Sequence, residues 1–319
     1  MRYRFALWLL SALTLILASA HAQQHKQEKQ QKTQEREEDV LSVNTDLVVL
    51  NVTITDGKDR YVAGLKEGDF KVFEDTVPQH IASFSFQEMP FAAVILLDIS
   101  ASMESKLSLA RAACSRFAGG IRDGDSVAIY SFGGLDIKVL QDFTESKDID
   151  PSVWEVRAEG ETPLYDALVK AAAALAKRPE RRRAILLVSD GADTRSRATM
   201  EEALRRVGAA GVMVYSVDLS DSALYHTPNR DNGAEVLKAF AAKTGGRFFH
   251  TPGGSKLRDA FTQTVEELRN QYTITYEPTN EKRDGRWRTI EVRVARPRLN
   301  IRTRQGYHAP RGRAAGGGS

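Results

Sequence analysis

Hydrophobic and polar positions alternate in two ways along the chain. Between residues 91 and 270, short apolar runs alternate with stretches whose apolar residues recur at helical spacing. The apolar runs predict strands at 92–99, 126–132, 137–143, 184–189, 212–218 and 247–250. The helical stretches are 104–119, 163–177, 199–210, 233–244 and 255–270. This alternation predicts an α/β domain with a doubly wound, mostly parallel sheet and helices on both faces.

One predicted strand does not fit a purely parallel sheet. The run 137–143 is joined to the preceding run through Gly133 and Gly134, which is too short for a crossover helix. We therefore predict a single antiparallel strand at the edge of the sheet.

The segments on either side of this domain have a period of two. Leu50, Val52 and Ile54 alternate with polar residues, and after the last helix Ile290 and Val292 do the same. The pattern predicts half-buried strands on both sides. Two separate small sheets would be marginally stable, so we expect both segments to form one smaller β-rich unit with the α/β domain inserted in it.

The first 39 residues are unlike the rest of the chain. Arg2 and Arg4 precede an apolar run, and Ala20-His21-Ala22 follows it, as in a cleaved signal peptide. A retained membrane anchor is the alternative, although the run is short for a bilayer span. Residues 23–39 contain no apolar side chain and are expected to form a disordered linker. No later segment is long and apolar enough to form a transmembrane helix, so we expect an exported protein, secreted or periplasmic or on the cell surface.

The predicted organisation of the chain follows from these patterns. It consists of a signal peptide at 1–22, a linker at 23–39, a β-rich segment at 40–90, the α/β domain at 91–270, a basic β-rich segment at 271–310 and a flexible tail at 311–319.

The charge, the cysteine and histidine content and the absence of known catalytic motifs narrow the possible functions. Removal of Arg2 and Arg4 with the leader lowers the formal net charge from +3 to about +1, which favours no particular partner. The single cysteine, Cys114, lies on an apolar helical stripe and is expected in the core, rather than as a reactive or intermolecular thiol. The histidines lack metal-ligand spacing, and the sequence has no Gly-x-Ser-x-Gly elbow, phosphate-binding loop or His-Glu-x-x-His.

Five oxygen-bearing side chains follow predicted strands or open a predicted helix. Asp98, Ser100 and Ser102 follow one buried strand, Asp190 follows another, and Thr162 precedes a helix. Ligands of parallel α/β sheets bind beyond the carboxyl ends of the strands. Carboxylates and hydroxyls are hard donors that suit Mg²⁺, Mn²⁺ or Ca²⁺ and not zinc. The alternative is that each residue separately caps a helix or forms a turn.

The order Asp-x-Ser-x-Ser, Thr and Asp-Gly resembles the metal-ion-dependent adhesion site (MIDAS) of the von Willebrand factor type A (VWA) domain over roughly residues 90–270. With its strand-rich flanks, the chain also resembles the VWFA-related family of Acidobacteria. The resemblance implies that Ser100 and Ser102 coordinate the metal directly and that Asp98 and Asp190 often act through water. It also implies that Thr162 joins when an acidic ligand binds.

This resemblance predicts a non-enzymatic, divalent-cation-dependent protein-binding or adhesion module. Mg²⁺ is the favoured cation, and the partner is a protein that presents an Asp or Glu carboxylate. One alternative is a metal-dependent hydrolase on the same cleft, although the chain shows no general base or nucleophile for it. Another is a cell-envelope scaffold with a vestigial metal site.

The C-terminal segment is strongly basic. Residues 282–313 carry eleven Lys or Arg against two acids. They would form either an anion-binding surface or a solvated strand face whose charges deter edge pairing. Without aromatic residues interleaved among the basic ones, the second interpretation is favoured and no nucleic acid is expected as a partner.

Overall fold

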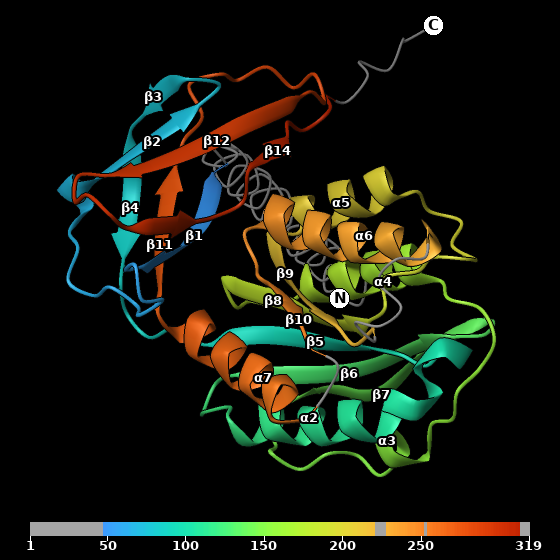
Figure 1. Cartoon of the computed structure of the whole chain (residues 1–319). Helices are drawn as coiled ribbons and strands as arrows, with labels where there is room; N and C mark the ends of the chain where they lie inside the picture. Colours follow the sequence, from blue (N-terminus) through green and yellow to red (C-terminus); the bar gives the residue numbers. More distant parts are fainter. Residues whose placement is uncertain (1–46, 221–227, 252–253, 313–319) are drawn as a thin grey trace, which may run out of the picture. The chain divides into compact units, whose positions relative to one another are not determined.

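The computed structural model describes residues 47–220, 228–251 and 254–312 (Figure 1). The predicted signal peptide, the linker and most of the predicted tail lie outside these residues. None of the helices within the described ranges has the length and apolar character needed to cross a bilayer.

A six-stranded sheet forms the centre of the α/β domain, in the order β10-β9-β8-β5-β6-β7. Its strands are β5 (Phe91–Asp98), β6 (Ser126–Gly133), β7 (Asp136–Thr144), β8 (Arg182–Ser189), β9 (Val212–Asp218) and β10 (Phe248–His250). All neighbours are parallel except β6 and β7, which pair antiparallel. The predicted doubly wound, mostly parallel sheet with one antiparallel edge strand is confirmed.

Helices cover both faces of this sheet (Figure 1). Helices α2 (Leu107–Gly119) and α7 (Gly254–Arg269) pack with the short α3 (Ser152–Glu155) on one face, where Cys114 is buried. The opposite face packs against α4 (Leu164–Leu175), α5 (Met200–Ala209) and α6 (Pro228–Thr244). Because both faces are covered, every residue of β5 and β6 is buried, which explains the apolar run of β5 and the mostly apolar sequence of β6.

Two helix starts differ from the prediction. The segment expected to begin helical at residue 104 begins as the 3₁₀ turn η2 (Ala101–Lys106), and the α-helix starts at Leu107. Helix α6 begins at Pro228, ahead of the predicted residue 233. Proline is well suited to a first helical position, but the polar residues after it lack the apolar period on which the prediction depended.

The β-rich unit combines strands from both ends of the described chain. One sheet has the order β13-β1-β11-β4 and the other β14-β12-β2-β3. The strands before the α/β domain are β1 (Val48–Thr55), β2 (Phe70–Glu74), β3 (Val77–Gln79) and β4 (Ile81–Ser85), with a 3₁₀ turn η1 (Glu67–Asp69). Those after it are β11 (Gln271–Tyr276), β12 (Trp287–Val294), β13 (Asn300–Arg302) and β14 (Gly306–His308). The antiparallel pairs β1–β11 and β2–β12 join the two segments and confirm the predicted β-rich unit.

Strands β1 and β11 are buried on both faces, so the prediction of half-buried strands is wrong for them. Their apolar residues lie in the core of the β unit. On the polar face, the Thr53 hydroxyl donates to Glu267 of α7 at 3.2 Å, and the Gln271 amide donates to Tyr215 of β9 at 3.3 Å. The polar face therefore packs against the α/β domain instead of facing water.

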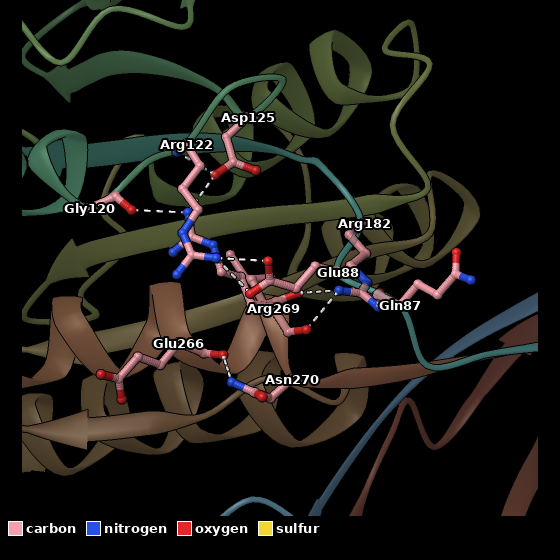
Figure 2. Close-up of polar contacts among 10 residues, drawn as sticks. Gln87, Glu88, Gly120, Arg122, Asp125, Arg182, Glu266, Arg269 and Asn270 are labelled. Atoms are coloured by element: carbon pink, nitrogen blue, oxygen red, sulfur yellow. Dashed lines mark hydrogen bonds and ion pairs between the residues drawn. The ribbon is translucent and has the colours of Figure 1, made fainter. Parts of the chain in front are cut away.

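A buried arginine joins the two points where the chain enters and leaves the α/β domain (Figure 2). Arg182, the first residue of β8, is fully buried, and burial lowers its pKa to about 10. Its terminal nitrogens donate to the carbonyl oxygens of Gln87 (2.9 Å), Leu268 (2.9 Å), Arg269 (3.1 Å) and Gln271 (2.7 Å). One side chain thus fixes both junctions to the amino end of the sheet.

Candidate metal-binding site

The Asp98 carboxylate lies at the carboxyl end of β5 and is almost completely buried. One oxygen accepts the backbone N–H of Ser100 at 2.8 Å, and the other accepts the hydroxyl of Ser189 at 2.6 Å. Burial, reinforced by the negative charge of Asp190, raises the pKa of Asp98 to about 7. The carboxylate is therefore held in a place where its charge is poorly solvated.

The hydroxyls of Ser100 and Ser102 lie side by side at the start of η2. Their oxygens are 3.1 Å apart, with Ser100 buried and Ser102 exposed. Buried Met103 anchors the turn, and its N–H donates to the Ser100 carbonyl at 2.9 Å. The tight turn therefore presents both hydroxyl oxygens next to the end of β5.

Asp190 follows β8, the neighbour of β5, and is only 8% exposed. It accepts the N–H of Ala192 at 3.2 Å, while the N–H of Gly191 donates to the Ser189 hydroxyl at 2.9 Å. Gly191 has φ +82°, and a Cβ there would lie 2.2 Å from the carbonyl oxygen of Gly233. Only glycine fits this turn, which explains the residue after Asp190.

Hydrogen bonds between loops hold the backbone of Thr162. Its N–H donates to the Thr194 hydroxyl at 2.8 Å, and the N–H of Thr194 donates back to the Thr162 carbonyl at 3.0 Å. Nearby, the N–H of Ala101 donates to the Gly160 carbonyl at 3.4 Å. These bonds tie the Thr162 loop to the loops after β5 and β8. Within the described ranges, the Thr162 side chain makes no hydrogen bond to the other four predicted residues.

Helix capping does not account for these hydroxyls. Ser102 lies inside η2, whose N-terminal cap is Ser100 and has no side-chain capping bond. Pro163, not Thr162, occupies the N-terminal cap of α4, again without a side-chain capping bond. Asp190 does accept a turn N–H, so for this residue the turn interpretation holds alongside any role as a ligand.

Among the described residues, basic side chains do not neutralise the two carboxylates. In the described part of the chain, no Lys, Arg or His forms an ion pair with Asp98 or Asp190. A set of two carboxylates and neighbouring hydroxyls fits a hard divalent cation. These described residues contain no group of three or more His, Cys, Asp or Glu that could hold a metal ion, so the hydroxyls would have to contribute ligands.

Two contributors were missed by sequence reasoning. Ser189 bonds to Asp98 although 91 residues separate them, and Thr194 holds the backbone of Thr162. Ser189 directly precedes Asp190, and its place at the end of a buried strand was a usable signal. Thr194 lies in a polar loop without a periodic sequence pattern, so only the tertiary structure shows its contact with Thr162.

The nearby acids Asp166 and Asp193 support the loop after Asp190. Asp166 accepts the N–H groups of Arg197 and Ala198 at 3.0 and 2.9 Å. Asp193 accepts the hydroxyl of Ser196 at 2.6 Å. Both carboxylates thus accept hydrogen bonds that hold this loop in place.

Comparison with known proteins identifies the domain. Residues 93–192 match the von Willebrand factor type A domain, a range that contains all five predicted ligands. The chain contains a VWA domain. A search of curated proteins returned no match.

Several solved structures are similar to the VWA domain and part of its surroundings. BatB, a conserved hypothetical protein from Bacteroides thetaiotaomicron, is 18% identical with a TM-score of 0.47, over 56% of this chain and 98% of its own. The vWF domain of the type V pili tip protein Mfa5 from Porphyromonas gingivalis is 14% identical with a TM-score of 0.45, over 56% and 95%. The pilus adhesin SpaC from Lactobacillus rhamnosus GG is 10% identical with a TM-score of 0.47, over 80% and 49%.

Proposed function

We propose that this protein is an exported, divalent-cation-dependent protein-binding or adhesion module and not an enzyme. Asp98, Ser100, Ser102, Thr162 and Asp190 would hold the cation, with Mg²⁺ favoured over Mn²⁺ or Ca²⁺. Export rests on the signal peptide predicted from the sequence, and the VWA family match supports the interaction role.

The observation that carries this proposal is the pair of uncompensated carboxylates beside the serine hydroxyls. Asp98 is buried, its pKa is raised partly by Asp190, and neither carboxylate has an ion-pair partner in the described ranges. A buried charge without a partner costs several kcal/mol unless it is neutralised. A bound cation would neutralise both carboxylates.

The mostly neutral oxygen donors also suggest what would bind. Ser100, Ser102 and Thr162 supply uncharged oxygens, so a divalent cation would keep part of its positive charge. That charge would attract a carboxylate from a protein partner to an open coordination position. We therefore propose a partner that presents an Asp or Glu side chain, and no nucleic acid.

Calorimetric titration of Mg²⁺ and Mn²⁺ tests the proposal. We expect one saturable site in the full chain and a loss of affinity of about tenfold or more in Asp98→Asn and in Asp190→Asn, which removes about 1.4 kcal/mol or more of binding free energy. Asp193→Asn is the matched control, because Asp193 is a neighbouring acid outside the predicted ligand set. It should bind the cations within a few-fold of the wild type.

The titration is repeated with excess glutamate, because the site could bind its cation only when a carboxylate completes the coordination. If the folded wild type binds no cation under either condition, the adhesion mechanism is wrong. The scaffold interpretation with a vestigial site would then replace it.

A further inference from the structure

A large pocket lies where α5 meets the β unit. It has a volume of about 640 Å³, within the usual range for sites of small organic ligands. Much of its wall is apolar and comes from Met200 and Leu204 of α5, Val212 of β9 and Trp287 of β12. Such a wall favours an apolar ligand body.

A smaller hollow of about 280 Å³ adjoins this pocket. The two share Val49, Asn51, Gly211 and Arg304 as lining residues. The smaller hollow is also lined by Arg181 and Arg183, which flank the start of β8. A largely apolar compartment therefore adjoins one that is lined by three arginines.

The three arginines that line the two compartments lack salt bridges within the described residues. In the described part of the chain, none of Arg181, Arg183 and Arg304 forms an ion pair with a carboxylate. Arg183 donates only to carbonyl oxygens, including that of Ala210 at 3.1 Å. Among the described residues, the only acid that lines either compartment is Glu201, which is exposed.

Arg304 connects the two compartments. Within the described ranges, its Nε is buried without a hydrogen-bond partner, and its one bond through a terminal nitrogen, to the Gly208 carbonyl, is long at 3.5 Å. Glu74 is a buried carboxylate near enough to influence Arg304. Its Oε2 accepts the hydroxyls of Tyr276 at 2.7 Å and Tyr307 at 2.9 Å, and its Oε1 has no hydrogen-bond partner among the described residues, so it makes no hydrogen bond to Arg304 there. The guanidinium therefore has hydrogen-bonding capacity left for a ligand.

We propose that the two compartments together bind an amphiphilic organic anion. Its apolar body would fill the larger compartment, and its carboxylate or phosphate head would contact Arg304, Arg181 and Arg183. Guanidinium groups bind carboxylate and phosphate through paired hydrogen bonds, which accounts for an arginine cluster at this end.

This site is separate from the candidate metal site. It lies near the starts of β8 and β9, whereas Asp98 and Asp190 lie at or just beyond the carboxyl ends of β5 and β8. The inference does not depend on cation binding, so Asp190→Asn or a chelator should leave it unchanged.

Calorimetric titration of the full chain with decanoate and decyl phosphate, both below their micellar concentrations, tests the proposal. We expect saturable one-to-one binding of at least one anion, and no comparable binding of decanol or decyltrimethylammonium. The stronger of the two anions identifies the head group. If decanol binds as tightly as the anions, or if neither anion binds, the proposal is wrong.

Variants that are expected to weaken or to tighten anion binding make the test more specific. Arg304→Gln should weaken anion binding about tenfold, and Arg181→Gln, an exposed position, by about threefold. Glu201→Gln removes the one acid of the lining and should tighten binding by about twofold. Arg293→Gln is the matched control, because this exposed arginine pairs with Glu291 outside both compartments. Unchanged affinity in both arginine variants of the pocket would overturn the assignment.

Discussion

Buried groups of opposite charge lie at the two ends of strand β8, within the strand at one end and beside it at the other. Arg182 begins the strand at the junction with the β unit, while Ser189 ends it at the candidate metal site, next to Asp98 and Asp190. Both ends are buried and both place charge away from water. They differ in what surrounds that charge.

At the junction, both terminal nitrogens of the buried guanidinium are hydrogen-bonded within the fold. The terminal nitrogens of Arg182 donate to four backbone carbonyls, from Gln87 and from the stretch 268–271. At the other end, Asp98 has two hydrogen-bond donors but faces Asp190, a second negative charge. The four hydrogen bonds of Arg182 let this buried guanidinium stabilise the fold, although its Nε has no partner among the described residues, whereas two neighbouring carboxylates are suited to binding a cation.

The largest effect is expected from breaking the junction. Arg182→Leu would leave four carbonyls without their donor and should lower the free energy of unfolding by about 4 kcal/mol. Arg182→Lys retains a charge and three donors, so it should recover part of the loss. Urea denaturation followed by circular dichroism measures both variants.

An exposed arginine of the same region is the control. Arg122 pairs with Glu88 at 2.7 Å, but the two side chains are 60% and 65% exposed (Figure 2). Arg122→Gln should change the free energy of unfolding by no more than about 0.5 kcal/mol. Equal losses in Arg182→Leu and Arg122→Gln would show that the carbonyl contacts do not stabilise the junction.

At the metal-site end, the glycine turn is expected to be the most sensitive position. Gly191→Ala would bring a Cβ against the Gly233 carbonyl and impose a left-handed conformation on alanine. We expect a loss of about 3 kcal/mol by urea denaturation, together with weaker cation binding because Asp190 would shift. Gly119→Ala, at the end of α2 with open space around it, should be nearly neutral. A neutral Gly191→Ala would refute the close backbone approach.

A smaller effect is expected from Ser189→Ala. The change removes the hydroxyl donor to Asp98 and the acceptor for the Gly191 N–H. Stability without added cation should fall by about 2 kcal/mol, the usual range for a hydrogen bond to a charged group. Ser189→Thr keeps the hydroxyl and should lose less. If Ser189→Ala and the wild type unfold at the same urea concentration, the Asp98 contact contributes nothing to stability.

The fold class could be predicted from the sequence because its signals are local. Short apolar runs, helical stripes and the Gly133-Gly134 link gave the sheet and its antiparallel edge. Strands β3 and β14 are three residues long, too short to show a period, and were not predicted. The start of α6 was missed because its first turns are polar.

The candidate ligands were also predicted from local motifs, but their surroundings were not. Asp98, Ser100 and Ser102 are near neighbours in sequence, and Asp190 follows a recognisable strand. Ser189 and Thr194 act on residues at distances of 91 and 32 positions along the chain. No periodic pattern specifies such pairs, since they depend on which strands and loops become neighbours.

By itself, the sequence determined the α/β class and the β-rich flanks, and it predicted a set of oxygen donors at two strand ends and one helix start. These follow from the spacing of side chains within single segments of the chain, which does not depend on contacts with other segments. Only the tertiary structure decided that β1 and β11 are buried on both faces, that Arg182 joins the two junctions and that an arginine-lined pocket lies beside α5. Each of these depends on packing between segments that are distant in sequence, which brings together groups whose spacing along the chain carries no signal.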